Sequence, residues 1–314
     1  MLKKSALRRV MVSTIALIIV TVLYFFPTTE EYTPLAQNVE YVSVDETPIY
    51  LINPDHYVVR TNIITKSEDE ISLAKELIEA LTQGSDKKEY ISEHFSQVIP
   101  QNTKILNISL DQGLLKIDFS KEFLNVEKDM EEKLIEALVY TLTEINGVEQ
   151  IMIFVDGTKL EVLPQSKINL PNTLDRSYGI NKVYDITSLK DLTKTTVYYI
   201  GEFNDLVYYV PVTKLENDKG NNKIEIIIDE LKSSPIYETN LMSYLASSVE
   251  LESYEELENQ VTLSFNNAIF DDFNEENILE EVKYSISLSI QDTLNVDEVI
   301  FKVNDEVVET FGES

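Results

Sequence analysis

The sequence predicts an α+β fold built as two tandem domains, each with a mixed sheet and two helices packed on one face, after one N-terminal transmembrane helix. Three observations lead to this expectation. The chain repeats its pattern at an offset of 148 residues, helical and strand periodicities alternate within each repeat, and an apolar run follows a basic start. So long a period indicates a duplicated domain, because the units of a solenoid are far shorter.

Residues 1–29 are expected to form a cytoplasmic stub and a transmembrane anchor. Four basic residues precede an uncharged apolar run of 17 residues, Val10 to Phe26. As a helix this run is about 26 Å long, close to a hydrocarbon core of about 30 Å. The positive-inside rule keeps the basic end in the cytoplasm and places the following domains outside. A cleaved signal peptide starts in the same way, but no small-x-small site follows Phe26, which favours a signal anchor.

The first domain is expected over residues 41–163, after a polar tether at 30–40. Apolar runs predict its strands at 47–52, 56–64, 103–110, 114–119 and 149–155. Apolar stripes at three- and four-residue spacing predict helices at 69–83 and 128–145. Gly84 would end the first helix, and Gly113 would make the tight turn between the third and fourth strands.

The second domain is expected over residues 193–314, where the same pattern recurs. The stripe of the helix at 130–145 returns in the helix at 278–293, so that Leu134 corresponds to Val282. Asn274, followed by two glutamates, is expected to cap that last helix. Between the domains, residues 164–192 contain many apolar side chains, among them Ile168, Leu170, Leu174, Ile180, Val183, Tyr184 and Ile186. This linker is therefore expected to pack between the domains and to set their relative orientation.

Composition excludes several classes of protein. With 26 Lys+Arg against 55 Asp+Glu the net charge is −29, so the surface repels a phosphate backbone and nucleic-acid binding is not expected. Cysteine is absent, which removes disulfides, thiol nucleophiles, cysteine-ligated metals and a lipidated cysteine.

No residue is assigned a catalytic, cofactor-binding or metal-binding role. The two histidines, His56 in a turn and His94 in a loop, do not make a catalytic triad or a zinc site. No glycine pattern predicts a phosphate loop. The acidic stretch 271–276 lacks the glycine and final glutamate of an EF-hand, and a helix N-terminus explains it more simply. Carboxylate pairs for glycoside hydrolysis stay open, because so many acids always supply pairs.

Tyrosine is the aromatic residue in surplus, with 17 copies. Four of them crowd the first hairpin of the second repeat: Tyr198, Tyr199, Tyr208 and Tyr209. Strand alternation would bury one of each adjacent pair and expose the other. Packing within the hairpin is one interpretation. The other is a protein interface, because tyrosine is enriched at the residues that dominate binding.

Three segments resemble the GerMN domain of sporulation and spore germination proteins. Residues 114–123, LLKIDFSKEF, resemble its strand-and-turn signature, and 99–103 resemble its proline turn. Residues 174–181 resemble the linker of the two-copy proteins, so the similarity covers about 41–310. The second repeat departs from the signature at 261–267. Lipoproteins of this family are held by a lipidated cysteine, which a transmembrane helix would replace here.

The resemblance implies an α+β domain related to the ring-building folds of secretion-type channels. It also implies a place in the space between mother cell and forespore. We therefore expect a membrane-anchored extracytoplasmic assembly or scaffold protein of sporulation or germination. It would contact envelope proteins of a channel complex and would not act as an enzyme. A binding module for a cell-wall polymer or a germination ligand is the alternative, and an envelope hydrolase is a third reading. The negative charge disfavours anionic polymers.

Overall fold

The computed structural model describes residues 46–87, 91–186, 192–204, 206–217, 222–233, 239–271 and 274–312, with Gly220 and six single residues between Met11 and Thr21. The chain divides into two compact units, residues 1–43 and 44–314. The described residues of the first unit are helical. No helix within the described ranges is long and apolar enough to cross a bilayer. Most of the predicted span at 10–26 and the whole predicted tether lie outside the described residues, so the anchor stays a prediction.

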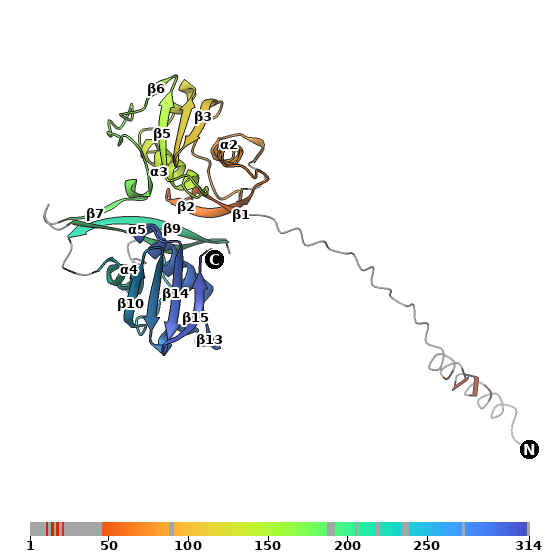
Figure 1. Cartoon of the computed structure of the whole chain (residues 1–314). Helices are drawn as coiled ribbons and strands as arrows, with labels where there is room; N and C mark the ends of the chain where they lie inside the picture. Colours follow the sequence, from red (N-terminus) through yellow and green to blue (C-terminus); the bar gives the residue numbers. More distant parts are fainter. Residues whose placement is uncertain are drawn as a thin grey trace, which may run out of the picture. The chain divides into compact units, whose positions relative to one another are not determined.

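In the second unit, each repeat has a four-stranded mixed sheet of its own (Figure 1). The first contains β3 (Ile105–Asp111), β4 (Leu114–Phe119), β5 (Gln150–Val155) and β6 (Thr158–Lys159). The second contains β10 (Leu251–Leu257), β11 (Gln260–Phe265), β14 (Glu298–Val303) and β15 (Glu306–Phe311). In both, the middle pair is parallel and the outer pairs are antiparallel. The edge strands even share an irregularity, a register shift after Ile105 and after Leu251.

A third sheet is shared by the two repeats. It contains β1 (Glu46–Ile52), β2 (Val58–Ile64), β7 (Val183–Asp185), β8 (Leu192–Phe203) and β9 (Leu206–Asn217). Strand β9 pairs with β8 along its length, and it also pairs with β2 of the first repeat and with β7 of the linker. Four consecutive residues of β1, Ile49 to Ile52, are buried. Both faces of this strand are therefore covered, as expected for a strand inside the molecule.

The helices of each repeat lie between its own sheet and the shared sheet (Figure 1). Helix α3 (Glu131–Leu142) contacts β1 and β5, and α2 (Glu70–Leu81) contacts β1 and β3. In the second repeat α5 (Glu280–Leu294) contacts β8 and β14, and α4 (Lys223–Ser233) contacts β8. The sequence predicted the helices and mixed sheets correctly. Placing the first hairpin of each repeat in the same sheet as the later strands was wrong, because that hairpin lies on the other side of the helices.

Some predictions for single residues are confirmed and one is wrong. Gly113 has a positive φ of 78° in the β3–β4 turn, as predicted. Leu134 and Val282 are both buried, at 2% and 5% exposure. The predicted cap Asn274 is wrong, because α5 begins at Glu280 and Asn274 starts β13 (Asn274–Ile278). Strand β13 pairs with β12 (Phe270–Asp271), so backbone pairing overrides a favourable capping sequence. Three short 3₁₀ turns complete the described elements, at Lys121–Leu124, Arg176–Tyr178 and Asn267–Ile269.

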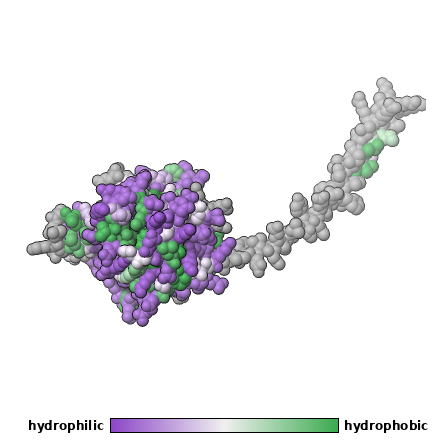
Figure 2. All heavy atoms as spheres, turned by 90° about the horizontal axis from the view of Figure 1, so that it is seen from above, coloured by the Kyte–Doolittle hydropathy of each residue, from purple (hydrophilic) through white to green (hydrophobic). Residues whose placement is uncertain are grey.

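The face of the protein in Figure 2 is mostly hydrophilic, with apolar side chains scattered between polar ones. This agrees with the acidic composition. The apolar residues of the two repeats instead form one continuous buried cluster.

Candidate functional site: the interface between the repeats

Corresponding residues of the two repeats meet at the shared sheet. Tyr50 and Tyr198 lie 148 residues apart, and their hydroxyl oxygens are 3.0 Å apart in the interior. The backbone N–H of Tyr50 donates to Thr141 Oγ1 at 3.0 Å, and that of Tyr198 donates to Ser289 Oγ at 2.8 Å. Thr141 and Ser289 are also 148 residues apart. The sequence repeat is therefore also a repeat of contacts, and its two halves meet at the tyrosine pair.

One arginine of the linker joins two corresponding acids. Arg176 lies 2.5 Å from Glu144 Oε1 and 2.7 Å from Asp292 Oδ1. Glu144 belongs to the first repeat and Asp292 to the second, again at an offset of 148. The Asp292 side chain is 1% exposed and that of Arg176 is 25% exposed. Charged hydrogen bonds of this kind are strong when they are shielded from water. Arg176 therefore connects both repeats at a single point.

The two acids differ electrostatically. Burial acts to raise the pKa of Glu144, but Arg176 and Arg60 outweigh it, and the pKa lies below the ordinary value. Burial raises the pKa of Asp292, and the opposing effect of Arg176 does not cancel it. Burial also raises the pKa of Tyr50. The phenol of Tyr50 therefore keeps its proton at neutral pH.

The hydrogen bonds between the two tyrosine hydroxyls and the two acids need one more proton than the hydroxyls supply. Tyr50 donates to Glu144 at 2.9 Å and Tyr198 donates to Asp292 at 3.1 Å, so neither hydroxyl has a proton left for the contact between the tyrosines. A proton on Asp292 resolves the count, because Asp292 then donates to Tyr198 and frees the proton of Tyr198 for Tyr50. The raised pKa of Asp292 favours this arrangement.

The linker adds a second connection at Asn181. Its Nδ2 donates to Val58 O at 2.7 Å and to Pro211 O at 2.8 Å, and its Oδ1 accepts from Val58 N at 2.9 Å. Val58 lies on β2 and Pro211 on β9, so one amide joins strands of both repeats. The adjacent Ile180 is fully buried, and its N–H donates to Thr213 Oγ1.

Two of the four tyrosines predicted as a protein interface, Tyr198 and Tyr208, instead lie inside the interface between the repeats. Tyr198 and Tyr199 are each 1% exposed, and Tyr208 is 4% exposed. The expected exposure of one tyrosine per adjacent pair was therefore wrong for Tyr198 and Tyr199, because both faces of β8 are covered. Tyr209 is partly buried and stacks on Tyr284 with ring centroids 5.6 Å apart. A contact between these tyrosines and a separate protein stays a prediction, and Tyr209 is the member whose surface remains accessible.

The histidines lie apart from this network. His56 has a positive φ of 63° in the β1–β2 turn, where its N–H donates to Asn53 O. His94 packs edge-on against Phe203, with centroids 4.9 Å apart. Within the described residues, no group of three or more His, Asp or Glu side chains is placed to hold a metal ion.

Comparison with known proteins agrees with the duplicated architecture. A family model described as "Germane: Sporulation and spore germination" matches the chain twice, at residues 48–161 and 196–309. The chain belongs to this family. The spore germination protein GerM of Bacillus subtilis (strain 168) is 34% identical over 275 residues, which is 84% of this chain and 74% of the relative.

The solved tandem GerMN domains of the sporulation protein GerM from Bacillus subtilis have the same arrangement. They match at a TM-score of 0.76 and 29% identity, over 87% of this chain and 98% of that chain. The predicted resemblance to tandem GerMN domains is thus confirmed. Family membership supports a role in sporulation, and GerM is described both as a spore germination protein and, for its solved domains, as a sporulation protein.

One feature of the sequence, the scarcity of arginine after residue 9, could have pointed to this interface. Only two arginines follow Arg9, at positions 60 and 176, while lysine supplies every other positive charge there. Arginine suits buried ion pairs better than lysine, because its planar group binds carboxylates at two points and is weakly hydrated. Both arginines lie beside Glu144. Which acids they meet could not be read from spacing, because the residues come from distant segments.

Proposed function

We propose that this protein is a membrane-anchored, extracytoplasmic assembly or scaffold protein of sporulation or spore germination. It works through contacts with envelope proteins of a channel complex in the space between mother cell and forespore. Family membership supports a role in sporulation or spore germination. The N-terminal basic and apolar run supports the anchor, and the following segment carries all 55 acids.

The observation that carries this proposal is the connection of both repeats through Arg176 and Asn181. An assembly protein must present two binding surfaces in a constant geometry. A linker with buried charged and amide contacts on both repeats provides that geometry, whereas a freely moving linker does not.

Affinity capture from sporulating cells tests this function. The tagged full-length chain, cross-linked before lysis, should retain specific envelope proteins and should sediment with membranes. Arg176→Met should reduce this capture, because the two repeats lose their common ion pair. Lys167→Met, which removes one linker charge whose amine donates to the nearby Pro164 carbonyl, is the matched control and should capture normally.

Two results would overturn the proposal. One is sedimentation with purified cell-wall polymer without any captured envelope protein, which would favour the binding-module alternative. The other is a mature N-terminus near Glu30, which would show that the apolar run is cleaved and would remove the anchor.

A further inference from the structure

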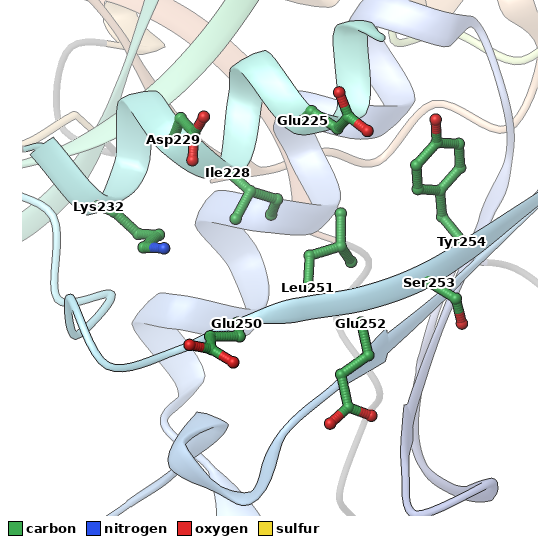
Figure 3. Close-up of a pocket in the computed structure, with 9 residues that line it drawn as sticks. All are labelled: Glu225, Ile228, Asp229, Lys232, Glu250, Leu251, Glu252, Ser253 and Tyr254. Carbon is green, nitrogen blue, oxygen red and sulfur yellow. The ribbon is translucent and has the colours of Figure 1, made fainter. Parts of the chain in front are cut away.

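The second repeat has an open groove between helix α4 and strand β10 (Figure 3). Its volume is about 500 Å³, within the range of ligand-binding clefts. Ile228 of α4 and Leu251 of β10 point into it from opposite sides, and Tyr254 closes one end. Ile228 and Leu251 therefore form a small apolar floor beside residues 251–254 of β10, within a lining that is otherwise mostly polar.

Strand β10 is the open edge of its sheet. Among the described residues it pairs with β11 alone. Every edge strand presents a row of backbone N–H and C=O groups on its unpaired side, which can accept another extended chain. In the first repeat the corresponding helix α2 lies in contact with the edge strand β3. The groove is therefore a feature of the second repeat.

Negative charge is concentrated at the same place. Four carboxylates line the groove, from Glu225, Asp229, Glu250 and Glu252, against one amine, from Lys232. None of the four carboxylates forms an ion pair with a described Lys or Arg. They are thus available to a charged partner.

The edge strand of the first repeat does not carry this charge. Because the register shifts of β3 and β10 coincide, Ile105 corresponds to Leu251 and Leu106 to Glu252. By the same register Leu110 corresponds to Glu256. Acids on an edge strand repel unselected strands, and they attract one that carries positive charge.

We propose that this groove binds an extended, lysine- or arginine-rich segment of a partner protein, which adds to β10 as a fifth strand. The proposal rests on the proposed function, in that it names the chemistry of one protein contact. Alternate side chains of such a strand would enter the apolar floor, and the others would reach the carboxylates. The open edge, the groove and the charge thus fit one kind of occupant.

Peptide binding to the purified full-length chain in detergent tests the proposal. The probe is a fluorescent ten-residue peptide of alternating lysine and valine, measured by polarisation at about 150 mM salt, where distant charges are screened. The variant Asp229→Asn/Glu250→Gln/Glu252→Gln should bind about tenfold more weakly than the wild type. The control Glu79→Gln/Asp111→Asn/Glu127→Gln removes the same charge from the first repeat and should bind like the wild type.

A second peptide separates strand addition from attraction by charge alone. It has the same sequence with alternate backbone nitrogens methylated, so that it cannot pair with a strand, and it should bind about tenfold more weakly than the probe. A photo-reactive group in the probe should attach to residues 225–232 or 250–257. Equal binding by both peptides, equal binding by both triple variants, or attachment elsewhere would overturn the inference. If the groove variant also captures envelope proteins normally from cells, the proposed function stands without this groove.

Discussion

Replacing Arg176 by Met should destabilise the protein more than any other change of a single linker charge. The substitution keeps the apolar part of the side chain and removes the guanidinium that contacts Glu144 and Asp292. Breaking a buried ion pair by removing one partner costs about 3–5 kcal/mol, because the other charge stays buried without compensation. A quarter of the Arg176 side chain is exposed, and Arg60 remains 3.8 Å from Glu144. We therefore expect about 3 kcal/mol, at the lower end of that range.

Urea unfolding, followed by tyrosine fluorescence and circular dichroism, measures this change. The chain has 17 tyrosines and no tryptophan, so tyrosine is its natural probe. The variant Arg176→Met/Asp292→Asn also removes the acid that has no other cation, while Glu144 keeps Arg60, and it should recover about 2 kcal/mol of the loss. A loss below about 1 kcal/mol for Arg176→Met, or a double variant no more stable than the single one, would refute the reasoning.

Three further expectations concern pH, the core and the histidines. Because the pKa of Asp292 is raised in the folded protein, this group lowers stability as pH rises above about 4. Asp292→Asn should remove that contribution, so the change in unfolding free energy from pH 4 to pH 7, measured with urea, should be more positive for the variant than for the wild type. Leu134→Ala and Val282→Ala should each cost about 2–4 kcal/mol, by the same unfolding measurement, because both side chains lie in the core; a cost near zero at either site would contradict the equivalence of the repeats. His56→Ala/His94→Ala should leave spore formation and germination intact in a viability count, and a folded double variant without function would point to catalysis.

Local pattern was sufficient for most elements, because their signals lie within a few residues. The predicted strand 114–119 is β4, and Gly113 makes the expected turn. The shared sheet could not be predicted in this way. Whether β1 and β2 join the later strands of their own repeat or β9 of the other depends on contacts across about 150 residues, and apolar alternation is compatible with both. The buried state of Tyr198 and Tyr199 follows from that sheet and was missed with it.

Duplication also explains why the two acids of the interface titrate differently. The linker occurs once, so its single arginine must serve both Glu144 and Asp292. In the first repeat the residue paired with Tyr50 across the β1–β2 hairpin is Arg60, which adds a second cation beside Glu144. In the second repeat the residue paired with Tyr198 is Pro211, which brings no charge.

Glu144 therefore stays ionised, while the pKa of Asp292 is raised. With Asp292 protonated, two guanidinium groups face one carboxylate, and the tyrosine hydroxyls form an unbroken chain of donors from Asp292 to Glu144. With Asp292 ionised, the two guanidinium charges balance the two carboxylate charges, but the chain of hydrogen bonds lacks one proton. A protein built from identical repeats would give both acids the same surroundings, and the change from arginine to proline at one strand position is the reason that the second cation lies beside Glu144 alone.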